Sequence, residues 1–183
     1  MESVIDKSSE QLMLDVAKGD LGAFDEIVLR HQKLAWGIAY RFVGDAHKAE
    51  DIAQEAFLRI LDAAPRYKPS AAFTTYLSRI VTRLCLDHAQ KKRPLPADSL
   101  PAVQDVNPSA AERMAVQDRD RAIRAALDRL PPAQRMAVVL RYFEGLDCRS
   151  VASAMETTVK SVERLLARAR HTLEPLLADL FRE

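Results

Sequence analysis

The chain of 183 residues is poor in glycine and in aromatic side chains, with five glycines against nine prolines and 6% Phe, Trp and Tyr. A sheet protein with many tight turns needs more of both, whereas Ala, Leu, Arg, Glu and Asp fill long stretches of this chain. The composition therefore favours an all-α fold. Because 48% of the residues are hydrophobic, the chain can bury the core of one medium domain or two small ones, which excludes disorder throughout.

Long apolar runs and paired cysteines are also absent. No run reaches the roughly 18 consecutive apolar residues that a membrane span requires, and the amino terminus does not lead from a basic into an apolar segment. We therefore expect no membrane insertion and a cytoplasmic location. Cys85 and Cys148 have no second Cys or His at ligand spacing beside them. We expect two buried thiols, without a disulfide framework or a zinc site, and no cofactor.

The formal net charge of +1 hides a segregation of charge along the chain. Residues 1–31 hold seven carboxylates against three cations. Residues 79–93 hold five cations against one carboxylate, and residues 160–171 hold four against one. Two separate basic patches behind an acidic segment suggest a polyanion such as nucleic acid on one side of the molecule and another protein on the other.

Four of the nine prolines fall between Pro94 and Pro108, in a stretch without helical periodicity. This stretch is typical of a flexible linker, so the chain divides into small helical domains over residues 1–93 and 109–183, joined by residues 94–108. Cap and stop signals predict helices over residues 8–19, 20–43, 45–64, 70–93, 109–131, 132–145, 149–155 and 158–175. The expected caps are Ser8, Asp20, Asp45, Ser70, Ser109 and Thr158, and Pro175 is expected to kink or end the last helix.

The end of the chain has the pattern of a helix-turn-helix: a helix closed by Gly145, a short helix, a tight break at Glu156 and Thr157, and a basic amphipathic helix. The basic side of that last helix suits base edges and phosphates, although periodicity leaves open an ordinary solvated face. The opposite, apolar side holds Val162, Leu166, Ala169 and Leu173. The candidate DNA-binding residues are Thr158, Lys160, Ser161, Glu163, Arg164 and Arg168.

The helix expected over residues 45–64 carries an apolar residue, Leu58, in the middle of its polar side. An apolar centre with a polar rim is typical of a small protein-docking site. Single exposed leucines are also common on protein surfaces, so the pattern by itself leaves both interpretations open. The candidate docking residues are Asp51, Gln54, Glu55 and Leu58.

The helix expected over residues 70–93 turns arginines and hydroxyls outward, with Tyr76 at the edge of that side. Such a face can follow a nucleic-acid backbone and can stack an unstacked base on the tyrosine. The outward positions are Thr75, Arg79, Thr82, Arg83, Leu86 and Gln90, followed by Lys91, Lys92 and Arg93. His88 is expected in the core or at the helix end, and Trp36 is expected in the core.

Together these residues resemble the extracytoplasmic-function (ECF, group IV) class of bacterial sigma factors, the small initiation subunits of RNA polymerase. The resemblance covers nearly the whole chain. Its motifs in the first half are Gly19-Asp20, Ala23-Phe24, the run 49–58, the run 73–77, Arg79-Ile80 and Asp87-His88. Its motifs in the second half are Leu127 to Pro131, Gly145-Leu146, Val151-Ala152, Ser161-Val162 and Arg168-Ala169-Arg170 with Leu173.

The resemblance implies a region 2 type domain over residues 1–93, a region 4 type helix-turn-helix domain over residues 109–183, and a role for each surface. The docking residues would bind core RNA polymerase. The last helix would bind the minus-thirty-five element of promoter DNA. The residues facing the minus-ten element would be Tyr76, Arg79, Arg83, Lys91, Lys92 and Arg93. The resemblance also implies control by an anti-sigma factor that wedges between or clamps the two domains.

The chain departs from the family's pattern where bases would be read. Tyr76 stands in place of the usual Trp, Arg83 in place of Asn, and Glu156 in place of a turn Gly. The promoter sequence is therefore not predicted. The distance between the elements fits the chain: an extended linker of about 60 Å and two domains adding about 26 Å just span 25 base pairs, or about 85 Å.

Other protein classes fit parts of the sequence. A stand-alone helix-turn-helix regulator would bind DNA without polymerase, and an adaptor that mimics a sigma factor would have little reason to keep the basic run 79–93. An enzyme is not expected, because no Ser/His/Asp or Cys/His arrangement, Gly-rich phosphate loop or metal-ligand spacing is found and the four histidines are scattered.

Overall fold

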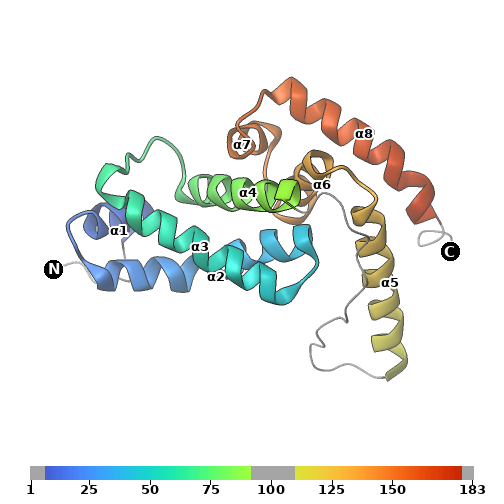
Figure 1. The fold of residues 1–183 in the computed structure, drawn as a ribbon, viewed down its shortest axis with the longest axis horizontal. Helices are drawn as coiled ribbons and strands as arrows, with labels where there is room; N and C mark the ends of the chain where they lie inside the picture. The colour runs from blue at the N-terminus through green and yellow to red at the C-terminus, as the bar shows by residue number, and fades with distance from the viewer. Residues whose placement is uncertain (1–6, 92–109, 179–183) are drawn as a thin grey trace.

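The structure is a computed structural model that describes residues 7–91 and 110–178, with side chains in the second range from residue 119 onward. Within these ranges the chain is helical and has no strand, which confirms the predicted all-α fold (Figure 1). The first part contains α1 (Ser9–Val16), α2 (Leu21–Val43), α3 (Ala46–Ala63), the 3₁₀ turn η2 (Ala64–Arg66) and α4 (Phe73–Lys91). The second part contains α5 (Ala110–Asp128), α6 (Pro132–Val138), the π-helical turn η3 (Val139–Phe143), α7 (Cys148–Ala154) and α8 (Val159–Leu177).

Local sequence sets the start of several helices. Ser8 and Gln11 form the predicted capping box, in which each backbone N–H donates to the other side chain. Asp20, Asp45 and Thr158 each accept from the backbone N–H three residues further on. These side chains satisfy donors that a helix leaves unpaired at its amino end, and the prediction of all four caps is confirmed.

Helix α4 begins later than predicted, at Phe73, and Ser70 does not cap it. The Ser70 N–H donates to the Lys68 carbonyl in the loop before the helix. The partner of the helix start is distant in sequence: the Phe73 N–H donates to the Glu10 carboxylate of α1 at 2.7 Å. A cap supplied by another helix leaves no local sequence signal, which is why the prediction was wrong. The predicted cap at Ser109 lies outside the described residues.

The first domain is built on a hairpin of α2 and α3, with α1 and α4 packed against α2. Gly44 closes the hairpin in the left-handed conformation (φ 75°) that glycine adopts without strain. Apolar residues at spacings of three and four turn inward from each helix. The fully buried side chains include Leu12, Ile27, Ile38, Ile60, Phe73 and Leu77.

The second domain packs α8 across α6 and α7. The predicted helix over residues 132–145 ends in a π-helical turn, in which the Glu144 N–H bonds the Val139 carbonyl at 3.1 Å. Pro175 lies inside α8 and does not end it. Near the end of a helix the missing N–H removes only one of the last backbone bonds. The core is formed by Met136, Leu140, Val151, Val162 and Leu166.

The two domains also pack on each other. Helices α6 and α7 lie along α4, and η3 lies against α2 (Figure 1). Thr82, expected on the outward side of α4, is only 1% exposed because the second domain covers it, and its hydroxyl lies 3.6 Å from the Met136 sulfur. The linker predicted over residues 94–108 lies outside the described residues.

Two side chains predicted to be buried are partly exposed. Trp36 is 39% exposed and stacks on Tyr40, with ring centroids 4.6 Å apart. The apolar stripe of α2 is wider than the surface that its neighbours cover, so the tryptophan lies at its edge. Cys148, the first residue of α7, is partly exposed as well. Cys85 is buried as predicted, and burial raises the pKa of its thiol to about 12.

Candidate nucleic-acid interface

Helix α8 presents its predicted basic side to solvent. Val162, Leu166 and Ala169 are buried on the opposite side, against the rest of the second domain. The exposed residues on the basic side are Lys160, Glu163, Arg164 and Arg168, and Ser161 is half-buried beside them. A helix held by one apolar side while its cations extend into water has the geometry that enters a DNA groove.

The turn before α8 fixes the direction of that helix and confirms the predicted helix-turn-helix. The Thr157 N–H donates to the Ala152 carbonyl at 2.9 Å and so closes α7. Glu156 occupies the left-handed region at φ 51°, a conformation that strains a residue with a Cβ. The Thr158 hydroxyl accepts from the Ser161 N–H at 3.2 Å. That hydroxyl is thus engaged as a cap, which limits what it can offer to DNA.

The predicted docking residues lie together on the outward side of α3, which we call the α3 surface (Asp51, Gln54, Glu55 and Leu58). Leu58 is 57% exposed, and Asp51 and Gln54 are exposed beside it. The half-buried Glu55 pairs with Arg59 at 2.8 Å, one helical turn away. An exposed leucine within a polar rim is therefore present in the folded domain.

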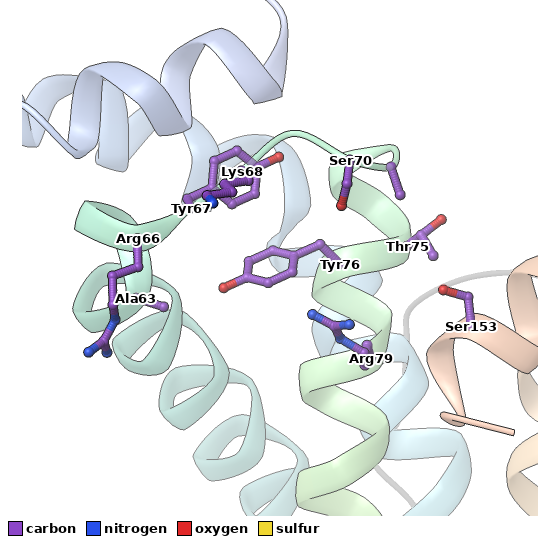
Figure 2. Close-up of a pocket in the computed structure, with 10 residues that line it drawn as sticks. Ala63, Arg66, Tyr67, Lys68, Ser70, Thr75, Tyr76, Arg79 and Ser153 are labelled. Atoms are coloured by element: carbon purple, nitrogen blue, oxygen red, sulfur yellow. The ribbon is translucent and has the colours of Figure 1, made fainter.

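A pocket of about 330 Å³ opens between the end of α3, the loop before α4 and the first turns of α4. Figure 2 shows Tyr76 and Arg79 of α4 facing the end of α3 across this space, with Tyr67 at its upper edge. We call it the loop pocket; it is lined by Ala63, Arg66, Tyr67, Lys68, Ser70, Ala71, Thr75, Tyr76, Arg79 and Ser153. Its volume is at the small end of the range of about 300–1,000 Å³ for ligand sites, which suits one base and excludes a duplex.

The loop pocket combines aromatic rings with cations. The rings of Tyr67 and Tyr76 meet edge to face at 5.3 Å, and the Arg79 guanidinium lies 5.6 Å from the centroid of Tyr76. Burial raises the pKa of both tyrosines, with Arg79 opposing the shift at Tyr76, so both hydroxyls stay neutral at physiological pH. The Tyr67 hydroxyl is buried and has no hydrogen-bond partner within the described residues. Such a lining can stack and hydrogen-bond an unstacked base.

Only some of the residues predicted to face a minus-ten element line the loop pocket. Tyr76 and Arg79 do, whereas Arg83 is exposed one turn further along α4. Lys91 is exposed at the last residue of α4. Residues 92–93, which complete the predicted set, lie outside the described residues. The structure thus brings Tyr76 and Arg79 together near the start of α4. The other two described cations of the set, Arg83 and Lys91, are exposed further along the helix.

Several pocket residues were missed by the sequence analysis. The loop over residues 65–69 reads Pro-Arg-Tyr-Lys-Pro and supplies an aromatic ring between two cations. That composition could have indicated a nucleic-acid-binding segment. It lies between the amphipathic helices, however, and helical periodicity gives no information about such a segment. Ser153 belongs to α7 and reaches the loop pocket only because the domains pack together. No local pattern predicts such a contact.

A second hollow, of about 710 Å³, lies on the second domain between η3 and α8. Most of its wall is apolar, and at its rim an Arg170 nitrogen lies 3.4 Å from the Tyr142 hydroxyl. It suits an apolar segment of a protein better than nucleic acid. The lining residues are Val138, Tyr142, Leu166, Arg170, Leu173, Glu174, Leu177 and Ala178.

The described residues offer neither a metal site nor a membrane span. No three His, Cys, Asp or Glu side chains within residues 7–91 and 119–178 gather in a way that would hold a metal ion. In the same ranges, every helix is too short or too polar to cross a bilayer. The candidate sites of the described residues are therefore the basic side of α8, the α3 surface and the loop pocket.

Both parts of the chain match domain families of sigma factors. Residues 27–94 match sigma-70 region 2, and residues 120–173 match sigma-70 region 4. The first match contains the α3 surface and all of the loop pocket lining except Ser153, and the second contains Ser153 and the helix-turn-helix. A chain with both regions differs from a stand-alone helix-turn-helix regulator, which the sequence had left as an alternative.

Similar proteins extend the match to the whole chain. The RNA polymerase sigma-H factor of Pseudomonas aeruginosa is 32% identical over 97% of this chain and 97% of its own length. The ECF RNA polymerase sigma factor SigW of Bacillus subtilis is 31% identical over 98% of this chain and 100% of its own. The sigma factor RpoE, solved with the anti-sigma factor NepR from Bartonella quintana, shares the fold, with a TM-score of 0.66 and 18% identity over 85% of this chain and 96% of that one. The chain therefore belongs to the ECF sigma factors, the initiation subunits that bind core RNA polymerase and direct it to promoters.

Proposed function

We propose that this sigma factor, a member of group IV, divides its work among three surfaces: the α3 surface, the loop pocket and the basic side of α8. The first two belong to a region 2 domain over residues 1–93, and the third to a region 4 domain over residues 109–183. Because the chain belongs to the ECF sigma factors, its partners are core RNA polymerase and promoter DNA. The exposed side chains and the loop pocket indicate which residues contact the polymerase and which contact the promoter.

The α3 surface docks on core polymerase. Burying an exposed leucine such as Leu58 against a partner gains about 1.5–3 kcal/mol when the burial is complete. Asp51, Gln54 and Glu55 supply the polar rim that sets the direction of docking. Because Glu55 already pairs with Arg59, a cation of the polymerase would share or replace that partner.

The loop pocket receives one base of the minus-ten element after the base has left the duplex stack. The observation that carries this proposal is a pocket with room for one base whose lining includes Tyr67, Tyr76 and Arg79. Extruding a base costs a few kcal/mol, and stacking it on an aromatic ring returns about 1–3 kcal/mol. Arg83 and Lys91 of α4 add exposed cations for the separated strand, and Lys92 and Arg93 follow them in the sequence.

The basic side of α8 reads the minus-thirty-five element. A guanidinium pairs with the two acceptors of guanine, so Arg164, in the exposed middle of this side, is the candidate base reader. Glu163 can accept from a cytosine amino group. The other candidates, Thr158, Lys160, Ser161 and Arg168, position the helix on phosphates. Together they give the second domain its own sequence preference.

The chain itself makes and breaks no covalent bond in this proposal; it works in the cytoplasm, where the polymerase is. RpoE from Bartonella quintana is bound to an anti-sigma factor in its solved structure. We infer that an anti-sigma factor controls this chain too, by the same kind of binding. The apolar hollow between η3 and α8 offers such an inhibitor a surface on which to bury apolar side chains.

The proposal is tested by transcription in vitro with core polymerase on a library of randomised promoters. The wild-type chain is expected to select one element near minus thirty-five and one near minus ten. Leu58→Asp should weaken association with core polymerase at least tenfold, because it places a charge at the centre of the α3 surface. Leu21→Asp is the matched control, since Leu21 is 65% exposed at the start of α2. Equal association of both variants with core polymerase would contradict the docking role.

A further inference from the structure

The first turn of α4 carries two residues of the loop pocket, Thr75 and Tyr76. Their backbone N–H groups both donate to the carbonyl of Ala72, the residue before the helix, at 3.0 and 3.2 Å. An alanine side chain cannot accept a hydrogen bond, so the residue at the cap position leaves the first N–H groups of α4 without a side-chain cap. The order of this turn, and with it the direction of Tyr76, therefore depends on groups from other helices.

Helix α1 supplies the missing partner. The Glu10 Oε1 atom accepts from the Phe73 N–H at 2.7 Å. This bond is the main cause that lowers the pKa of Glu10, so the carboxylate is charged at physiological pH, and a negative charge at the amino end of a helix stabilises its first turn. Burial raises the pKa of Tyr67 and the charge of Glu10 raises it further. The field of this one carboxylate thus reaches both the start of α4 and the second tyrosine of the loop pocket.

A second row of contacts leads from α1 through α2 to the same turn. The Ser9 Oγ atom lies 2.7 Å from His31 Nε2, and the His31 ring lies 4.8 Å from the buried ring of Phe73, centroid to centroid. Phe73 in turn lies 6.2 Å from the ring of Tyr76. Burial lowers the pKa of His31, so its ring is neutral at physiological pH. Since protein interiors are close-packed, a change at His31 is transmitted to the rings beyond it.

Helix α1 lies outside the part of the chain that matches sigma-70 region 2, which begins at residue 27. It packs on α2 and on η2, at the end of α3 (Figure 1). Its buried side chains, Leu12, Met13 and Val16, explain how it is held in the first domain. They do not explain why its polar residues bond to the start of α4 and to the histidine beside Phe73.

We infer that α1 is a positioning element of the loop pocket, which orders the start of α4 and so fixes the direction of Tyr76. Glu10 holds the first turn of the helix. Ser9 holds His31, whose ring supports Phe73. The inference rests on the proposed function, since it takes the loop pocket as the site of one extruded base. A tyrosine that samples several directions receives the base only in a fraction of the molecules, and the affinity for the base falls by that fraction.

The test measures how much the captured base contributes to binding. The full chain, assembled with core polymerase, is bound to single-stranded DNA that carries the minus-ten element selected from the promoter library. Each nucleotide is replaced in turn by an abasic one, and the resulting loss of affinity is the base penalty at that position. At the captured base the wild-type penalty should be about 5- to 150-fold. That position is recognised because Tyr76→Ala removes its penalty.

Glu10→Ala and His31→Ala should each reduce the base penalty at that position to half or less. A variant that only folds less well loses affinity for intact and abasic DNA alike and keeps the wild-type penalty. Asp15→Asn is the matched control, because it changes the other carboxylate of α1, whose partners are Lys7 and Lys18, and it should keep the wild-type penalty. Glu10→Gln retains an acceptor and should lose less; it carries the test if Glu10→Ala does not fold.

A double-mutant cycle shows whether α1 acts through the tyrosine. In a Tyr76→Ala background, Glu10→Ala and His31→Ala should lower the affinity for intact DNA no further than Asp15→Asn does. Wild-type base penalties in the Glu10 and His31 variants would overturn the inference and leave the proposed function standing. If no position has a penalty that depends on Tyr76, the proposed function of the loop pocket is wrong, and the inference is overturned with it.

Discussion

The two helices proposed to meet DNA differ in how much they depend on the rest of the molecule. Helix α8 starts at its own cap, Thr158, and its basic side is exposed. Helix α4 starts at a carboxylate of α1, Glu10, and one edge of its outward side is covered by the second domain at Thr82. The same kind of amphipathic basic sequence thus gives two different results. In the second domain the proposed DNA-binding side of α8 is exposed, whereas in the first domain the proposed DNA-binding side of α4 is partly covered by the other domain.

The largest effect is expected at the loop pocket. Tyr76→Ala should reduce open-complex formation on a duplex promoter about 5- to 150-fold, because it removes about 1–3 kcal/mol of stacking. Tyr76→Phe keeps the ring and should stay within about threefold of wild type. The loss should shrink on a promoter whose minus-ten element is already unpaired, since extrusion no longer has to be offset. Both losses are measured by run-off transcription, and equal losses on both templates together with a lowered urea midpoint of Tyr76→Ala would show that Tyr76 acts in folding alone.

Next in size is base reading by α8. Arg164→Ala should lower discrimination between promoters at one upstream position by about 1–3 kcal/mol, while melting at the minus-ten element is unchanged once the complex has formed. The measurement is competition between promoter variants in transcription with core polymerase. Arg129→Ala is the control, because Arg129 is an exposed cation of the second domain outside the basic side of α8. Unchanged preference in Arg164→Ala would remove its base-reading role and leave it a phosphate contact.

The two helix starts should respond differently to acid. The bond from the Phe73 N–H is the main cause that lowers the pKa of Glu10 below 4.5. Its stabilisation is therefore complete above pH 4.5 and is lost as the pH falls through the lowered pKa. Glu10→Gln should cost about 1 kcal/mol at pH 7, the difference between a charged and a neutral hydrogen bond, and this cost should vanish in acid.

Thr158→Ala serves as the comparison for that experiment. It should cost about 0.5–2 kcal/mol at every pH, because a hydroxyl cap does not titrate in this range. Both costs are measured as free energies of unfolding by urea between pH 3 and 7. A Glu10→Gln cost that persists unchanged at pH 3 would mean that the charge of Glu10 does not hold the start of α4.

The smallest effect is expected at the turn before α8. Glu156→Gly should stabilise the chain by about 0.5 kcal/mol, because relief of the left-handed strain of about 1–2 kcal/mol is partly offset by the entropy that glycine loses on folding. The measurement is the urea midpoint, and Gly145→Ala, at φ 68°, should move it in the opposite direction. A destabilised Glu156→Gly variant would show that the glutamate side chain makes a stabilising contact.

Local rules predicted most of the secondary structure and the faces of α3 and α8. Caps such as Asp20 and Asp45, and apolar spacings of three and four, act within one or two turns, so a single sequence contains them. The exposure of Leu58 follows from the same periodicity. Periodicity gives the exposed side of each helix, whereas the partner of that side is proposed from the family.

The errors at α4 and the loop pocket have a different cause, which is contact between segments distant in sequence. Thr82 is buried because the second domain covers it, and α4 starts at Phe73 because Glu10 is there. Ser153 enters the loop pocket from α7 for the same reason. Helical periodicity states which side of a helix is apolar, but it does not state which polar side another domain occupies.

The bond between Glu10 and Phe73 has a consequence for the order of events at the ribosome. Both partners belong to the first half of the chain, and nascent chains fold domain by domain from the amino end. The first domain can therefore complete α4 and its own share of the loop pocket lining while α8 is still being translated. At that stage of synthesis Thr82 is still uncovered, and the second domain, which brings Ser153 to the pocket, arrives last.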